Sequence, residues 1–210
     1  MNSVWTDRYP SEFGWSLYGP EQTQNAHELY HILVDDNGVN SASAYAILGN
    51  LTTESFLNPG QWQYHENYDV QKGFGLGQWD PSTKVNDYLT AIGVPDTQAN
   101  MENAQYQIDF LLGNSGQWSL IYVDPNTGYS SYYDITVPVY NSLSDFLYDA
   151  GMDVEAKTKA WMACWERPNN AHAHLDSRIA YAQHWAGSPS ITLPLIILLA
   201  KVANARRLLK

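Results

Sequence analysis

Apolar side chains recur every three or four positions along several segments of this chain, and short runs rich in Gly, Pro, Asn and Asp separate these segments. Such spacing places apolar groups on one face of an α-helix, whereas Gly and Pro interrupt helices. The pattern predicts helices over residues 21–34, 41–57, 82–92, 97–112, 142–150, 154–166 and 171–185. We therefore expect a small domain built mainly from α-helices.

Residues 73–79 have a different pattern, with Gly at alternate positions in the run Gly-Phe-Gly-Leu-Gly-Gln-Trp. Asp80-Pro81 ends this run, which is typical of a short strand or hairpin. Glycine at every second position removes the side chains from one face, so that a large ligand can approach the backbone there. With this element, the expected fold class is α+β, predominantly α.

Glu54 is the first candidate for chemistry because it lies in the last turn of the helix over residues 41–57, just before Asn58-Pro59-Gly60. The partial negative charge of a helix C-terminus disfavours an ionised carboxyl group. With apolar neighbours such as Phe56 and Trp62, such a group is expected to keep its proton near neutral pH. A carboxyl group that holds a proton can donate it, as general acid catalysis requires.

Four motifs follow one another in the chain: Glu54-Ser55 with Asn58-Pro59-Gly60, the glycine run, Trp-Met-Ala-Cys-Trp-Glu-Arg-Pro at 161–168, and Arg-Ile-Ala-Tyr-Ala-Gln-His-Trp at 178–185. In this order the set resembles the phage tail-associated lysozyme family of the lysozyme-like superfamily. The first two motifs are also similar to the Glu-Ser and Gly-Leu-Met-Gln pair of soluble lytic transglycosylases. The resemblance covers about residues 25–187 and implies a lysozyme-like fold with a small β-hairpin beside the catalytic cleft.

The resemblance implies an enzyme that cleaves the β-1,4 bond between N-acetylmuramic acid and N-acetylglucosamine in peptidoglycan, with Glu54 as general acid and no cofactor. One alternative is a lytic transglycosylase, whose product is an anhydro-muramic sugar. Another is a phage tail or cell-wall-binding module that keeps the fold without activity.

The second catalytic group is open, because residues 64–72 contain no clear match to a second acid of the family. Glu66 and Asp69 are the candidates, and each is equally well explained as a solvated loop residue. A distance of about 5 Å between the two carboxyl groups suits a covalent nucleophile, whereas about 6.5–9.5 Å leaves room for a water. If neither residue serves, the N-acetyl or 6-hydroxyl group of the sugar completes the reaction.

Four residues near the motifs are candidates for substrate binding. Trp62, Tyr64 and Trp79 flank the motifs, and flat aromatic rings can cover the apolar faces of sugars while their polar edges form hydrogen bonds. Gln78 is expected to orient the substrate or a water, and its alternative is an outward-facing strand residue.

Two other groups of polar residues are given structural interpretations. Glu166 and Arg167 are expected to form an ion pair at a helix end rather than to act in catalysis. His172, His174 and His184 are expected to be solvated, and no metal is predicted, because His172 and His174 are two positions apart and do not share a helix face.

Composition excludes some classes of protein. A formal net charge of −11 argues against a nucleic-acid partner, which needs clustered Lys and Arg. The single cysteine excludes an internal disulfide. We expect Cys164 to be a small buried residue rather than the nucleophile of a cysteine peptidase, which is the third class of function considered.

The two ends of the chain differ from its centre. We expect an N-terminal arm over residues 1–20, a catalytic domain over 21–187 and a tail over 188–210 that is first aliphatic and then basic. The start lacks the pattern of a secretory signal, so a wall-cleaving enzyme would be carried in a virion, as in a phage tail, or be released to the cell wall. Residues 191–210 are expected to dock on the body or to contact another tail protein or a second copy, in preference to a membrane.

Overall fold

The computed structural model of the chain describes residues 17–63, 71–151 and 153–188. The candidates Tyr64, Glu66 and Asp69 lie outside the described residues, as does the tail over 191–210. The proposed division into arm, domain and tail therefore stays a prediction.

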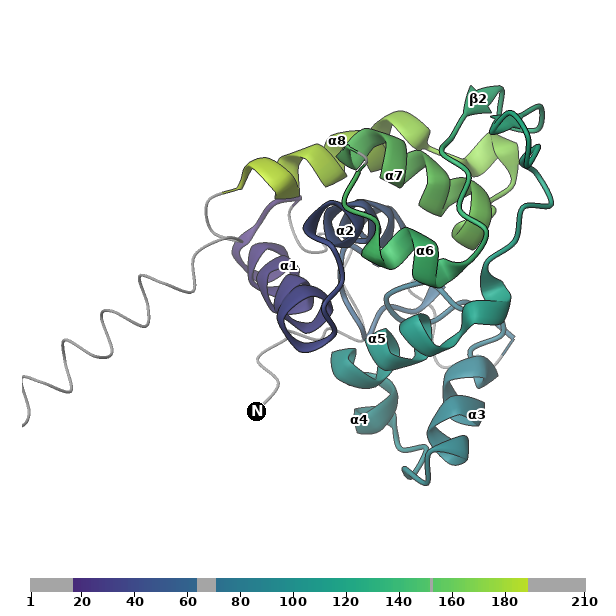
Figure 1. The fold of residues 1–210 in the computed structure, drawn as a ribbon. Helices are drawn as coiled ribbons and strands as arrows, with labels where there is room; N and C mark the ends of the chain where they lie inside the picture. Colours follow the sequence, from purple (N-terminus) through teal and green to yellow (C-terminus); the bar gives the residue numbers. More distant parts are fainter. Residues whose placement is uncertain (1–16, 64–70, 152, 189–210) are drawn as a thin grey trace, which may run out of the picture.

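Helix α2, Ser41–Ser55, is the centre of the body (Figure 1). It packs against α8, Leu175–Gly187, and α7, Val154–Trp161, on one side and against α1, Pro20–His31, on another. Most residues of α2 are buried, which explains why its sequence is apolar or small almost all round. The C-terminal end of α2, where Glu54 lies, is therefore surrounded by packed helices.

The ends of α2 are set by local hydrogen bonds. The N-cap is Asn40, whose side chain accepts a hydrogen bond from the backbone N–H of Ala42 at 3.0 Å. Within the first turn, the hydroxyl of Ser43 donates to the carbonyl of Phe146 at 2.8 Å. At the other end Phe56 adopts a left-handed conformation and stops the helix.

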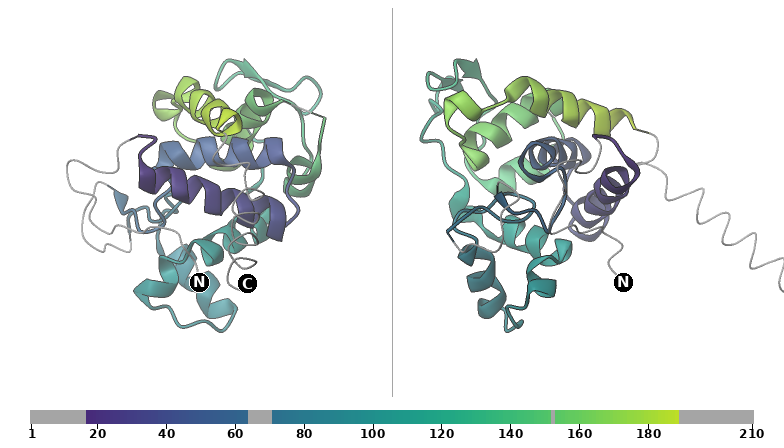
Figure 2. Two further views of the ribbon diagram at one scale, coloured as in Figure 1. Left: turned by 90° about the vertical axis from the view of Figure 1, so that its left-hand side faces the viewer. Right: turned by 180° about the vertical axis from the view of Figure 1, so that it is seen from behind.

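The lower part of the molecule contains α3, Thr83–Ala91, α4, Gln98–Met101, and α5, Ala104–Gly113, and both views in Figure 2 show it below the layer of α1 and α2. The single helix predicted over 97–112 is wrong, because the chain breaks between α4 and α5. Asn103 caps α5 by accepting hydrogen bonds from the N–H groups of Gln105 and Tyr106. These side-chain bonds start a new helix at this point, so the helix is interrupted although the apolar pattern continues.

Two helices end in π-helical turns. α1 continues as η1, Ile32–Asp36, and α7 continues as η4, Met162–Glu166. The remaining short elements are α6, Leu143–Tyr148, and the 3₁₀ turns η3, Ser115–Gln117, and η5, Asn170–His172.

In the described residues, regular β-structure is limited to strands β1, Tyr129–Ser130, and β2, Ile135–Thr136, which pair antiparallel. The predicted fold class, α+β and predominantly α, is thus confirmed. Residues 73–79 form a tight turn rather than regular strands, because their pairing is limited to isolated bridges of Phe74 with Trp62 and with Trp79. Between those bridges the chain turns through positive φ at Gly75 and Gln78.

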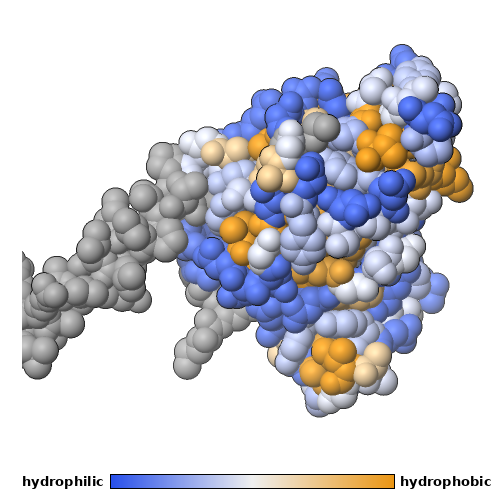
Figure 3. All heavy atoms as spheres, viewed as in Figure 1, coloured by the Kyte–Doolittle hydropathy of each residue, from blue (hydrophilic) through white to orange (hydrophobic). Residues whose placement is uncertain are grey.

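The surface in Figure 3 is mostly hydrophilic, with small separated hydrophobic groups. Within the described ranges, every helix is too short or too polar to cross a bilayer.

Candidate active site

Glu54 lies where the end of α2 meets the turn over residues 73–79. The hydroxyl of the next residue, Ser55, donates a hydrogen bond to the carbonyl of Leu76 at 2.9 Å, with the carbonyl of Leu51 as a second acceptor at 3.2 Å, and so ties the helix end to the turn. The side chain of Glu54 is 22% exposed. The carboxyl group is therefore supported on one side and open to a ligand on another.

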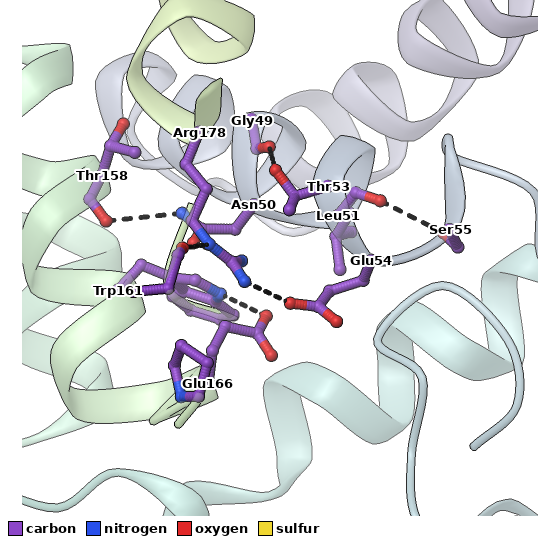
Figure 4. A network of polar contacts seen from close by, with 12 residues as sticks. Gly49, Asn50, Leu51, Thr53, Glu54, Ser55, Thr158, Trp161, Glu166 and Arg178 are labelled. Carbon is purple, nitrogen blue, oxygen red and sulfur yellow. Dashed lines mark hydrogen bonds and ion pairs between the residues drawn. The ribbon is translucent and has the colours of Figure 1, made fainter. Parts of the chain in front are cut away.

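Arg178 of α8 is the partner of Glu54 (Figure 4). Its Nη2 donates to Oε1 of Glu54 at 2.5 Å, its Nη1 to Oδ1 of Asn50 at 3.0 Å, and its Nε to the carbonyl of Ala173 at 2.7 Å. The Arg178 side chain is 2% exposed, so its charge is only weakly screened by solvent. The structure thus places a buried positive charge at the carboxyl group of Glu54, in addition to the partial charge of the helix end.

Asn50 fixes the guanidinium from the other side. It lies one turn before Glu54 on the same face of α2 and donates its own amide hydrogens to the carbonyl of Ala46 at 2.8 Å. The amide nitrogen and the amide oxygen of Asn50 both form hydrogen bonds, and these partners fix the oxygen toward Arg178. The network positions Arg178 before any ligand arrives.

Glu166, the last residue of η4, is a second carboxyl group in this network (Figure 4). Its Oε1 accepts a hydrogen bond from Nε1 of Trp161 at 2.9 Å. Burial, followed by the negative charge of Glu54, raises the pKa of Glu166 to about 8 against the opposing effect of Arg178. Glu166 therefore keeps its proton to a higher pH than an ordinary glutamate does.

The predicted ion pair between Glu166 and Arg167 is wrong. The guanidinium of Arg167 donates instead to the main-chain carbonyls of Cys164, at 2.9 Å, and Gln117. Arg167 has φ of 49°, so the backbone reverses direction there and carries its side chain away from the carboxyl group.

The predicted sugar-binding residues have different environments. Trp62 is 2% exposed and packs on Phe74, with ring centroids 4.5 Å apart, so almost none of its ring is accessible to a sugar. The amide of Gln78 donates to the carbonyls of Gln61 and Gly75, both at 3.1 Å, and so holds the turn together. Trp62 is a core residue here, and Gln78 contributes to the shape of the turn.

Trp79 borders a hollow of about 470 Å³ on the side of α3 and α5. The other residues that line it are Lys84, Asp87, Tyr88, Phe110, Asn114, Gly116 and Gln117. Gln117 also donates to the carbonyl of Trp165 at 3.1 Å, which connects the wall of this hollow to the residue before Glu166. Glu54 itself is not among the lining residues.

A second hollow, of about 670 Å³, lies in the region of β1. Tyr122 and Tyr132 line it and stack on one another with ring centroids 4.4 Å apart. Much of their surface is therefore used in packing against each other.

Cys164 is fully buried, as predicted, and burial raises the pKa of its thiol to about 12. A thiol in this state is a poor nucleophile, because the thiolate is the reactive form. Among the residues that the structure describes, no three His, Cys, Asp or Glu side chains gather in a way that could hold a metal ion.

Sequence reasoning missed Arg178 and Glu166 as members of the site. Arg178 and Glu166 lie more than a hundred positions from Glu54 in the sequence, so no local spacing links them to it. Asn50 had a local signal, since it precedes Glu54 by four positions on the same helix face.

Comparison with known proteins identifies the family of the chain. The family model for phage tail lysozyme matches residues 24–188. Morphogenesis protein 1 of Bacillus phage B103 is 33% identical over 98 residues, which are 47% of this chain and 26% of the relative. The matched part thus spans about a quarter of that relative. Since the family match covers most of the sequence, including Glu54, Glu166 and Arg178, this chain belongs to the phage tail lysozyme family.

Proposed function

We propose that the protein is a muramidase that cleaves the β-1,4 bond between N-acetylmuramic acid and N-acetylglucosamine in bacterial peptidoglycan. The observation that carries the proposal is the carboxyl group of Glu54, partly exposed beside the glycine-rich turn and held by the buried Arg178 in a chain of this family. A wall-cleaving glycosidase needs such a positioned carboxyl group at an open surface.

In the proposed reaction Glu54 protonates the glycosidic oxygen as the bond to the sugar carbon breaks. Negative charge appears on Glu54 as its proton leaves, and Arg178 at 2.5 Å stabilises that charge. The guanidinium is already fixed by Asn50 and Ala173, so it need not reorient during the reaction.

The group that completes the reaction is Glu66, Asp69 or the substrate itself. A carboxylate would act as nucleophile or as base for a water, and the spacing of the two carboxyl groups decides between those routes. Attack by the 6-hydroxyl group of the sugar would give an anhydro product and make the enzyme a lytic transglycosylase. Tyr64, Gln78 and Trp79 remain the proposed substrate contacts.

The setting we propose is a phage tail, from which the enzyme acts on the host cell wall. The family description and the phage relative support this setting. Residues 191–210 are proposed to contact another tail protein or a second copy of the chain.

The test is the clearing of purified cell walls, followed by mass spectrometry of the products. Wild type should clear the suspension, Glu54→Gln should lower the rate by about 100-fold or more, and the surface variant Glu155→Gln should match wild type.

Products lighter by one water identify a transglycosylase. Wall binding without clearing, unchanged in Glu54→Gln, would instead indicate a binding module. Activity retained in Cys164→Ala eliminates a cysteine peptidase.

A further inference from the structure

We propose that His27 and His31 of α1 bind one divalent transition-metal ion through their Nε2 atoms, and that Zn²⁺ suits this site best. Helix α1 lies at the outer side of the body, in front of α2 in the left view of Figure 2. The site is independent of the proposed cleavage of peptidoglycan, and its test needs no wall-clearing assay.

The sequence sets the spacing of the two ligands. His27-Glu28-Leu29-Tyr30-His31 places two histidines four positions apart, which puts both on one face of a helix. The segment has the pattern H-E-x-x-H, in which histidines on successive helical turns bind zinc. This pattern is short and recurs by chance, so the geometry of the side chains decides whether it can bind an ion.

The two imidazole rings bring the same atom together. Nε2 of His27 lies 3.1 Å from Nε2 of His31, and the ring planes are inclined by 64°. Two Zn–N bonds of about 2.0–2.1 Å that meet at about 100°, close to the tetrahedral angle, place their nitrogens about 3.1–3.2 Å apart. The observed distance therefore fits one ion bound by both rings. A hydrogen bond between the two nitrogens has the same length, so an ion would compete with one proton for this place.

A carboxylate stands behind each ring. Nδ1 of His31 donates to Oδ2 of Asp35, which lies one turn further along in η1, and Oε1 of Glu28 is 3.8 Å from Nδ1 of His27. A carboxylate at Nδ1 keeps the proton on that nitrogen and leaves the lone pair of a neutral imidazole on Nε2. Histidines that bind metals are oriented by such carboxylates, which also make the ligand more basic. Both rings thus present Nε2 to an ion.

The number of protein ligands limits the chemistry of the ion. The side chains of His27 and His31 are 25% and 21% exposed, so water can reach an ion between them. In the described part of the chain, no third His, Cys, Asp or Glu side chain meets these two at one point, so water would complete the coordination. Imidazole ligands favour Zn²⁺, Cu²⁺ and Ni²⁺ over Mg²⁺, which prefers oxygen. The site is therefore one for binding an ion, and not the three-ligand centre of a zinc peptidase.

A bound ion would stabilise a helix that supports the end of α2. The side chain of Asn25 on α1 donates to the carbonyl of Leu57 at 2.8 Å, and that of Gln22 donates to the carbonyl of Phe56 at 3.3 Å. These two acceptors directly follow α2. Because the folded helix holds the two imidazoles together and the unfolded chain does not, an ion that binds both favours the folded state.

The test is isothermal titration calorimetry of the full, untagged chain with Zn²⁺, after removal of metal with EDTA. At about pH 7.5 an ordinary imidazole is neutral. Wild type should bind one Zn²⁺ and give no comparable signal with Mg²⁺, and His27→Gln/His31→Gln should lose this binding. Asp35→Asn keeps both ligands and should weaken binding by about 10–100-fold. The control variant His172→Gln/His174→Gln should bind Zn²⁺ as wild type does.

Two further measurements identify the ligand atoms and the effect on the fold. In two-bond ¹H–¹⁵N spectra, Zn²⁺ should shift the Nε2 resonances of His27 and His31 while Nδ1 keeps its proton. The melting temperature of wild type should rise by about 5–10 °C when free Zn²⁺ is about 100 times the Kd, and that of His27→Gln/His31→Gln should not rise.

Three results would overturn the proposal: no binding of Zn²⁺ by wild type, binding that His27→Gln/His31→Gln retains, or coordination through Nδ1. If the double variant does not fold, Asp35→Asn and the nitrogen spectra of wild type still decide, because both keep the two histidines. A chain that clears no walls but binds Zn²⁺ in this way would disprove the proposed function and leave the metal site in place.

Discussion

The indole of Trp161 donates a hydrogen bond to Glu166, five positions further along the chain, because a π-helical turn lies between them. In a regular α-helix a residue five positions later lies about 140° round the axis and cannot meet its predecessor. A π turn, whose main-chain bonds join residues five apart, brings the two above one another. The bond from the N–H of Arg167 to the carbonyl of Met162 is such a bond. The irregular turn is what brings the carboxyl group of Glu166 to the indole of Trp161.

The stability of the protein should depend on pH through Glu166. An unfolded glutamate titrates at about pH 4.3, whereas burial raises the pKa of Glu166 in the fold to about 8. Folding therefore takes up a proton between those values, and the stabilising contribution, complete below about pH 4.3, is lost as the pH rises through about 8. The free energy of unfolding of wild type relative to Glu166→Gln should fall by up to about 1.4 kcal/mol per pH unit between pH 5 and pH 8. Urea unfolding at several pH values measures this slope.

The control for that slope is Glu155→Gln, which removes a surface carboxyl group paired with Lys159 on α7. Its stability difference from wild type should stay nearly constant over the same pH range, because the exposed pair is strongly screened. A flat profile for wild type relative to Glu166→Gln would contradict a buried, protonated Glu166.

The sequence could place Glu54 because every feature that locates it is local. Helical periodicity fixes its helix, and Asn58-Pro59-Gly60 fixes the end of that helix close to the residue. The partners Arg178 and Glu166 could not be found in this way, since they reach Glu54 only through the packing of α8 and η4 around α2. The inward direction of Glu166 depends in addition on a π turn, for which periodicity at 3.6 residues per turn gives no signal.

The aromatic residues show a second limit of sequence reasoning. Trp62 and Trp79 flank the motifs equally well, yet Trp62 is buried on Phe74 whereas Trp79 borders a surface hollow beside Phe110. Only the three-dimensional path of the turn over residues 73–79 distinguishes them. The backbone turns within this segment, at Gly75 and Gln78, and residues 73–79 therefore form isolated bridges and no regular strand, although glycine alternates in their sequence.

Replacing Arg178 by Lys should abolish most of the activity although the charge is kept. A lysine ammonium cannot reach Glu54, Asn50 and the carbonyl of Ala173 together, because it lacks the planar fork of donors. We expect wall clearing to fall by about 100-fold and the free energy of unfolding to fall by about 3 kcal/mol. Turbidity assays and urea unfolding measure the two effects.

Arg167→Lys is the matched control for that variant. It also loses donors to main-chain carbonyls, those of Cys164 and Gln117, but it leaves the contact between Arg178 and Glu54 intact. It should lose stability and keep most of its activity well below its unfolding temperature. Equal losses of activity in both variants would argue against a specific role for Arg178.

Lys157→Met should destabilise the fold without affecting the reaction. Lys157 is fully buried, and its Nζ donates to the hydroxyl of Ser43 at 2.8 Å and to the carbonyls of Phe146 at 3.0 Å and Asp149 at 2.6 Å. Removing the ammonium group deletes three hydrogen bonds from a charged donor, although Ser43 still donates to Phe146, at a cost of about 2–4 kcal/mol. Lys159→Met on the same helix, which breaks only a surface pair, should cost less than about 1 kcal/mol. A melting temperature unchanged in Lys157→Met would contradict this expectation.

Gly49→Ala should force α2 and α8 apart and thereby disturb the site at a distance. A Cβ at position 49 would lie 2.5 Å from Cβ of Ala182 and 2.6 Å from the carbonyl oxygen of Arg178, so the packed helix has to move. We expect a loss of about 2–3 kcal/mol in the free energy of unfolding, as for other overpacked sites. Because the displaced segment carries Arg178, activity should also fall at temperatures where the variant is fully folded. Gly113→Ala, at the open end of α5 with no atom near the added Cβ, should be neutral or slightly stabilising, and a similar loss there would show that the effect of Gly49→Ala does not come from the helix crossing.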